Sequence, residues 1–265
     1  MSMNSISSAE SAEITPAEKH ADDLPICRST LAFPLCIVPT SPALVAQLAP
    51  ADTASGRIRH RVREILRMLV DTTRESGTPV TEIVLVGSQD PRWHTEHRGN
   101  FRAWGAPEIQ LADGHYLAEL VLRYLCNELE PLITASYGSL QEFAAHQHEL
   151  GTLVLMGIDG SAGLSQSAPL AELPTASHAH QWSQALLGGN TSGPGFATHP
   201  NSEQLSRAGV WEPELWLEIA QLKAAGGITS LHLHDLDTTH GVARYIATGL
   251  IEPAAVLNRF FQQEF

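Results

Sequence analysis

The sequence is poor in cysteine and in positive charge. Its three cysteines, Cys27, Cys36 and Cys126, do not have the spacing of a metal-ligand set, and their number is odd. Cys36 and Cys126 lie in apolar runs, so we expect both to be small core residues of a protein from the reducing cytoplasm. Lys and Arg number 16 against 29 Asp and Glu, which gives a net charge of −13. This balance argues against nucleic acid or an anionic membrane surface as a partner and favours a small molecule or a cation.

Long apolar runs are also missing, and we expect no signal peptide in this sequence. No apolar stretch approaches the roughly 20 residues that a membrane-spanning helix needs. Residues 1–25 are rich in Ser, Ala and Glu and have no apolar centre. We therefore expect a polar N-terminal tail over residues 1–28 and a folded domain over residues 29–265. The predicted partner is a small-molecule ligand, and the sequence leaves both a monomer and a homodimer open.

Four short apolar runs alternate with helical patterns. The runs lie at residues 31–38, 83–86, 153–156 and 228–233, and small or polar residues follow each of them at once. Apolar residues recur at helical spacing between the runs, for example over residues 58–70. This alternation predicts a single-domain α/β fold, with a central sheet that is mainly parallel or mixed and is covered by helices on both faces. Five arginines between residues 57 and 67 occupy the other sides of that helix, and we interpret them as a solvated face rather than an anion site.

The polar residues after these runs are the candidate site. In open α/β sheets, ligands bind in the crevice beyond the carboxyl ends of the strands. We expect Ser41, Asp159, Ser161 and His240 to line this crevice. We also expect some of the carboxyl groups of Asp90, Asp159 and Asp235 to lie within about 10 Å of one another, the distance over which charges still couple.

A metal site is one hypothesis for the same crevice. His94 or His97, together with His234 and Asp235, would supply the two imidazoles and one carboxylate that non-haem iron(II) enzymes use. In that case Fe(II) or another divalent metal would be the cofactor, and His234 and Asp90 would be the catalytic residues. The alternative is that these are ordinary loop residues with no metal.

Other motifs point to structure rather than chemistry. Gly157–Gly163 contains neither the dinucleotide-binding fingerprint nor the lysine of a phosphate-binding loop, and Asp159 stands where a nucleophile elbow needs glycine. We interpret this segment as a tight turn that allows close approach of a ligand or a neighbouring strand. Trp104 is either the wall of an aromatic pocket or a loop anchor. The glycine-rich stretch 188–195 is either a lid over the crevice or a surface connection.

Taken in order, these segments resemble a known family. Residues 35–44 look like the first strand and turn of the class III extradiol ring-cleavage dioxygenase superfamily, in a divergent actinobacterial branch. Supporting similarities lie at 83–87, 100–107, 157–169 and 235–249, so the resemblance spans residues 31–250. It implies one α/β domain. Active members cleave catechol-type rings with Fe(II) and O₂, and they hold the iron with two histidines and a glutamate while a further histidine serves as acid and base.

The departures from this pattern concern the active site. Pro42 stands where active members have a histidine, and their second ligand histidine falls near Asp90. Residues 160–166 contain no acid/base histidine, and no glutamate near the carboxyl terminus matches the third ligand. Two hypotheses remain open. The first is a divergent member that binds a small molecule or a partner without cleaving rings, and the second is a metal-dependent oxidoreductase with a rebuilt His/Asp site.

Overall fold

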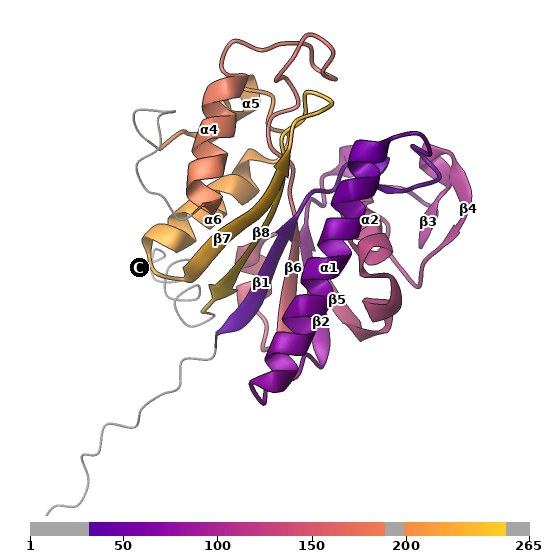
Figure 1. The fold of residues 1–265 in the computed structure, drawn as a ribbon, viewed down its shortest axis with the longest axis vertical. Coiled ribbons are helices and arrows are strands. Elements are labelled where there is room, and N and C mark those ends of the chain that lie inside the picture. The colour runs from indigo at the N-terminus through magenta and orange to yellow at the C-terminus, as the bar shows by residue number, and fades with distance from the viewer. Residues whose placement is uncertain (1–31, 189–198, 253–265) are drawn as a thin grey trace, which may run out of the picture.

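Six strands form the central sheet, in the order β5-β2-β6-β1-β8-β7 (Figure 1). The computed structural model describes residues 32–188 and 199–252. The predicted tail, residues 1–28, therefore lies outside the described residues. The strands are β1 (Phe33–Val38), β2 (Glu82–Gly87), β5 (Ile133–Tyr137), β6 (Thr152–Gly157), β7 (Ile228–Asp237) and β8 (Arg244–Ile251).

The sheet is mixed and mostly parallel. The strands from β5 to β1 run parallel, whereas β8 pairs antiparallel with both β1 and β7. Because β7 runs in the direction of β1, it ends at the same edge of the sheet as β1, β2, β5 and β6. The predicted α/β fold with a mixed, mainly parallel sheet is therefore confirmed.

Apolar side chains on both faces of the central strands bury the sheet in two cores. Leu35 and Ile37 of β1 point into one core, while Cys36 and Val38 point into the other. Strands buried on both faces read as continuous apolar runs, which is why the sequence marked them clearly. Cys36 is fully buried, and burial raises the pKa of its thiol far above the usual range. The prediction that Cys36 is a small core residue is confirmed.

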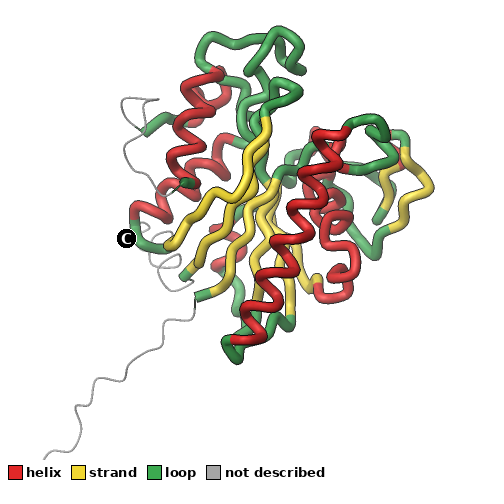
Figure 2. The backbone as a smooth tube through the Cα atoms, in the orientation of Figure 1, coloured by secondary structure: helices red, strands yellow, loops and turns green. Residues whose placement is uncertain are grey.

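Helices cover the two faces (Figure 2). Side chains of α1 and α2 pack in one core, and those of α3 to α6 pack in the other. The Asp52 carboxylate caps α1, a capping box of Asn201 and Gln204 starts α5, and Pro213 occupies the first turn of α6. None of the described helices is long and apolar enough to cross a membrane. Their bounds are α1 (Thr53–Glu75), α2 (Leu117–Cys126), α3 (Leu140–Ala144), α4 (Ala176–Leu187), α5 (Ser202–Arg207) and α6 (Pro213–Ala224).

The structure differs from the sequence pattern at the last strands. The fourth apolar run does not stop at residue 233, because β7 continues to Asp237 and turns directly into β8. β3 (Asn100–Phe101) and β4 (Ala106–Gln110) form a separate, small antiparallel sheet. Both features depend on antiparallel pairing between neighbouring segments. The sequence does not reveal this pairing, because polar residues interrupt the apolar pattern of these strands.

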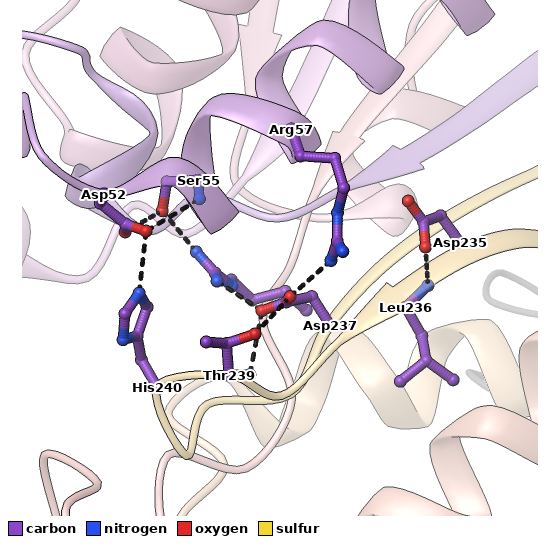
Figure 3. Close-up of polar contacts among 9 residues, drawn as sticks. Asp52, Ser55, Arg57, Asp235, Leu236, Asp237, Thr239 and His240 are labelled. Carbon is purple, nitrogen blue, oxygen red and sulfur yellow. Dashed lines mark hydrogen bonds and ion pairs between the residues drawn. The ribbon is translucent and has the colours of Figure 1, made fainter.

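A buried ion pair joins the β7–β8 hairpin to the start of α1 (Figure 3). Arg244 Nη2 lies 2.5 Å from Asp237 Oδ1, and both side chains are 2% exposed. Arg244 Nη1 donates to the Ser55 hydroxyl at 2.6 Å, and that hydroxyl donates to the Asp52 carboxylate. Asp237 also accepts from Arg57 and Thr239. This network ties three segments together at the carboxyl edge of the sheet.

The Asp237→Ala substitution should destabilise the fold strongly. It leaves the Arg244 guanidinium buried without its counter-ion, and breaking a buried pair in this way costs about 3–5 kcal/mol. Arg57→Ala is the matched control, since the Arg57 side chain is 59% exposed and exposed pairs contribute about 1 kcal/mol or less. Urea unfolding measures the loss of unfolding free energy in each variant. Equal losses would contradict the prediction that the buried pair contributes more to stability than the exposed one.

Candidate functional site

A cavity opens at the carboxyl edge of the sheet, beyond β1, β2 and β6. Its volume is about 330 Å³. It lies at the topological switch point, because β1 leads into α1 on one face of the sheet and the neighbouring β6 leads to helices on the other. We call it the rim cavity, and it is lined by Thr40, Ser41, Pro42, Ser88, Trp93, Trp104, Leu117, Ala118, Asp159, Ala162, Pro169, Trp211, Glu212 and Val242.

The expected crevice is therefore present, and three of the four predicted strand ends border it directly. Residues 40–42 follow β1, Ser88 follows β2 and Asp159 follows β6. The end of β7 does not border the cavity directly, but Val242, from the turn between β7 and β8, lines it. Of the residues expected to line the crevice, Ser41 and Asp159 do so.

Asp159 contributes a half-buried carboxyl group to the lining of the rim cavity. Its Oδ2 atom accepts hydrogen bonds from the Thr40 amide at 3.1 Å and the Thr40 hydroxyl at 3.0 Å. Its Oδ1 atom is buried and has no hydrogen-bond partner. Burial raises the pKa of this carboxyl to about 6, although the Thr40 hydrogen bonds and the positive charge of Arg244 oppose the rise.

Gly157 allows this arrangement. A Cβ atom at residue 157 would overlap the methyl group of Thr40. Thr40 therefore approaches Asp159 because the last residue of β6 has no side chain. The interpretation of the 157–163 segment as a close-approach turn agrees with this contact.

Glu212 is a second acidic group in the rim cavity. It directly precedes α6, where Pro213 starts the helix. The pKa of its carboxyl is raised to about 7, mainly by burial, then by the negative charge of Asp159 and more weakly by that of Asp90. Arg92 and a hydrogen bond with Trp93 act in the opposite direction. The cavity therefore holds two carboxyl groups that change charge near neutral pH.

Three tryptophans wall the rim cavity. Trp93 and Trp211 meet edge to face, with ring centroids 5.9 Å apart. The Arg92 guanidinium lies 5.4 Å from the Trp211 ring and 6.0 Å from the Trp93 ring. The Arg92 guanidinium donates two hydrogen bonds to the Asp90 carboxylate, at 3.0 and 2.7 Å, and these hold Arg92 in place. Asp90 therefore positions the aromatic wall.

Trp104 forms the remaining aromatic wall. It ends the short helix η3 (Arg102–Trp104), and its ring packs on Phe101 at 6.2 Å. Trp104 thus combines the two roles that the sequence left open, because it anchors its loop and lines the cavity.

Ser161 and His240 were expected in the crevice but lie elsewhere. Ser161 is 1% exposed, and its hydroxyl donates to the Ala208 carbonyl at 2.5 Å, so it joins the turn after β6 to the end of α5. The His240 imidazole lies on the hairpin turn, 2.9 Å from Asp52 (Figure 3). Both side chains are held by partners outside the cavity, which corrects their predicted placement.

The residues predicted to bind a metal are not brought together. His94 follows β2 and stacks on His115, whereas His234 and Asp235 lie within β7. Three strands separate β2 from β7, which corresponds to about 19 Å at the usual strand spacing. Across residues 32–188 and 199–252, no group of three His, Cys, Asp or Glu side chains is placed to hold a metal ion.

The catalytic role predicted for His234 also finds no support in its position. Its Nε2 atom lies 2.7 Å from the Thr248 hydroxyl of β8, away from the rim cavity. Burial lowers the pKa of this imidazole, and the neighbouring His232 and Arg61 lower it further. The expectation failed because β7 continues past residue 233, which places His234 inside the ladder instead of at its end.

The predicted spacing of about 10 Å between aspartate carboxyl groups stays a prediction, although two of the three act on the same group. Asp90 and Asp159 follow the neighbouring strands β2 and β6, and both act on the pKa of Glu212. Asp235 accepts from the Leu236 amide and lies on the far side of the hairpin network (Figure 3). Its register partner is Ile246 in the middle of β8, so it does not reach the cavity.

The arginines of α1 form structural contacts. Arg59 donates to the Leu44 carbonyl, Arg63 donates to the carbonyls of Tyr124 and Leu125, and Arg67 pairs with Glu128. These contacts agree with the interpretation of this face as something other than an anion site. They also go beyond a purely solvated face, because they connect α1 to neighbouring segments.

Sequence reasoning missed Glu212, Trp211 and Trp93 as cavity residues. The only local signal is that Pro213 marks a helix start directly after Trp211 and Glu212. Their approach to β1 and β6 depends on how α6 docks, which no local pattern encodes. The glycine-rich stretch 188–195, interpreted as either a lid or a surface connection, lies outside the described residues except for Gly188.

Two larger cavities do not have this character. One, of about 650 Å³, lies between α4 and α6, and the other, of about 480 Å³, lies at the opposite end of the sheet beside Phe33. Neither is lined by an Asp or Glu side chain. A binding site is better indicated by convergent polar groups with shifted pKa values than by volume.

Fold and cavity together define an α/β protein with an acidic, tryptophan-walled cavity at the switch point of its sheet. Comparison of the sequence with protein-family models and with curated proteins finds no match.

Removing the charge of Asp159 should change how stability depends on pH. The folded pKa, about 6, exceeds the ordinary value of 3.8, so the wild-type protein loses stability as the pH rises between these values. The Asp159→Asn variant lacks this loss. At pH 7 its free energy of unfolding should exceed that of the wild type by at most about 3 kcal/mol. Urea unfolding between pH 4 and pH 8 measures the difference.

Asp90→Asn is a control of opposite sign. The hydrogen bonds from Arg92 lower the pKa of Asp90, so this carboxylate stabilises the fold above its unfolded pKa. The variant should therefore lose stability relative to the wild type as the pH rises through the acidic range. An Asp159→Asn difference that stays constant with pH would contradict the assignment of Asp159 as a strained buried acid.

Proposed function

We propose that this protein binds a small aromatic molecule in the rim cavity and does not cleave its ring. The single observation that carries the proposal is a cavity walled by three tryptophans and lined by the carboxyl groups of Asp159 and Glu212, where the Oδ1 atom of Asp159 has no partner in the chain. Buried polar atoms are nearly always hydrogen-bonded, and one that is not calls for a ligand or a water molecule. The cavity at the switch point is where an open α/β sheet offers a ligand site.

The size and lining of the cavity favour an aromatic ligand. A volume of about 330 Å³ lies at the lower end of the range for small-molecule sites, so a molecule with one or two rings fills it. The rings of Trp93, Trp104 and Trp211 offer stacking surfaces. Asp159 and Glu212 accept hydrogen bonds, and they orient a ligand through its donor groups.

The resemblance to the class III extradiol ring-cleavage dioxygenase superfamily supports ancestry more than activity. We place the chain there as a divergent member. Pro42 and Asp90 stand where active members hold iron, and loss of imidazole ligands weakens metal binding severely. The alternative, an oxidoreductase with a rebuilt His/Asp site, receives no support from the positions of His94, His234 and Asp235.

Trp104→Ala should weaken binding of benzyl alcohol and of catechol at least about tenfold, since it removes one stacking surface of the cavity. Isothermal titration calorimetry measures the affinity. Trp182→Ala is the matched control, because Trp182 lines a different cavity. Both variants are first tested for cooperative unfolding. Failure of both probes to bind the wild type, or equal losses in the two variants, would overturn the proposal.

Incubation with catechol, Fe(II) and O₂ should yield no ring-opened product. We also expect that protein purified without chelators contains no stoichiometric metal and that His234→Ala leaves the metal content unchanged. Absorbance of the ring-opened product and elemental analysis provide the two measurements. Turnover, or a bound metal that is lost in His234→Ala, would instead establish the rebuilt oxidoreductase site.

A further inference from the structure

We infer that the aromatic ligand carries a protonated amine and that this group pairs with Asp159 and Glu212. The inference rests on the proposed function and specifies its ligand class. Its geometric basis is a cavity with two carboxylates, aromatic walls and no lysine or arginine in its lining. Each of these three features contributes separately.

The two carboxylates pair with no lysine or arginine. Among the described residues, no Lys or Arg nitrogen lies within the 4.0 Å limit of an ion pair from Asp159 or Glu212. Asp159 receives only the two hydrogen bonds from Thr40, both on Oδ2. Oδ1 is left without a hydrogen-bond partner in the chain.

The cations near the cavity are already engaged. Arg244, whose positive charge lowers the pKa of Asp159, is bound through its Nη atoms by Asp237 and Ser55, while its buried Nε atom has no partner. Arg92, near Glu212, is held by two hydrogen bonds from its side chain to Asp90, and it lies over the rings of Trp93 and Trp211. These two guanidiniums moderate the negative charge of the cavity but do not pair with it. A ligand cation is the missing counter-charge.

The aromatic walls favour the same ligand. An ammonium group is attracted to the face of a tryptophan ring, and the attraction grows when water is excluded. Trp104 and Trp93 line the same cavity as both carboxylates. The net charge of −13 also steers cations toward the protein and repels anions.

Binding of a cation should also release protons. Asp159 and Glu212 titrate at about 6 and about 7, so part of the population is protonated near neutral pH. Asp90 adds negative charge nearby, whereas Arg92 and Arg244 add positive charge. A bound ammonium group stabilises the charged form of both carboxyls, and their protons leave to solvent. A neutral ligand has no such effect.

The test compares benzylammonium with benzyl alcohol, two probes of nearly the same shape. Calorimetric titrations run from pH 5 to pH 8.5, and each is repeated in two buffers of different ionisation enthalpy to count released protons. We expect benzylammonium to bind at least tenfold more tightly than benzyl alcohol at pH 8. This preference should shrink toward pH 5, and protons should be released near pH 6.5.

Asp159→Asn should abolish most of the preference for benzylammonium and reduce proton release, while benzyl alcohol still binds. Glu212→Gln provides a second, independent variant if the first does not fold. Asp71→Asn, on the exposed side of α1, is the matched control and should behave as the wild type.

The outcomes separate the two proposals. If benzyl alcohol binds as well as benzylammonium, or if the preference is the same in Asp159→Asn, this inference is overturned and the proposed function stands. If neither probe binds, both are overturned. Tighter binding of benzoate than of benzylammonium would also overturn the inference, because it would show that the cavity selects anions.

Discussion

The buried pair of Asp237 and Arg244 is the interaction on which the carboxyl edge of the sheet depends. Arg244 is the first residue of β8 and Asp237 is the last of β7, so the pair closes the hairpin. Through Ser55 and Asp52 the same guanidinium fixes the start of α1. Burial by itself would raise the pKa of Asp237, but the hydrogen bonds from Arg244 and Thr239 outweigh it and lower the pKa. The aspartate therefore remains charged, and its charge holds three chain segments in one arrangement.

That arrangement determines the geometry of the rim cavity. The hairpin turn also bonds to the segment after β6, where the Gly160 amide donates to the Ala243 carbonyl at 2.8 Å. The segment after β1 is held from the other side by the contact between Thr40 and Asp159. These contacts hold the segments after β1 and β6 in place on either side of Asp159. A rigid surround of this kind is what a preorganised binding site requires.

The fold was largely predictable from the sequence, whereas the site was predictable only in part. Buried strands on both faces appear as continuous apolar runs, so the residues after β1, β2 and β6, including Asp159, were correctly placed at one edge. His234 and Asp235 were misplaced because an antiparallel hairpin extends β7 through polar residues, a pairing that depends on β8. Glu212 could not be predicted, since it reaches Asp159 only through the docking of α6. Local patterns report which segments are buried, but not which distant segments meet.

Asp159 and Glu212 show that such a site is identified better by the folding stability that it sacrifices than by its shape. A buried carboxyl without a counter-ion destabilises the fold at neutral pH, and a second acid nearby makes the cost larger. The Asp237–Arg244 pair proves that this fold accommodates a buried aspartate together with its cation at the same edge of the sheet. The rim cavity contains the acids without the cation. The two sites thus differ in one respect: Asp237 has a cation supplied by the chain, whereas Asp159 and Glu212 do not. This difference points to a counter-charge that comes from outside the chain.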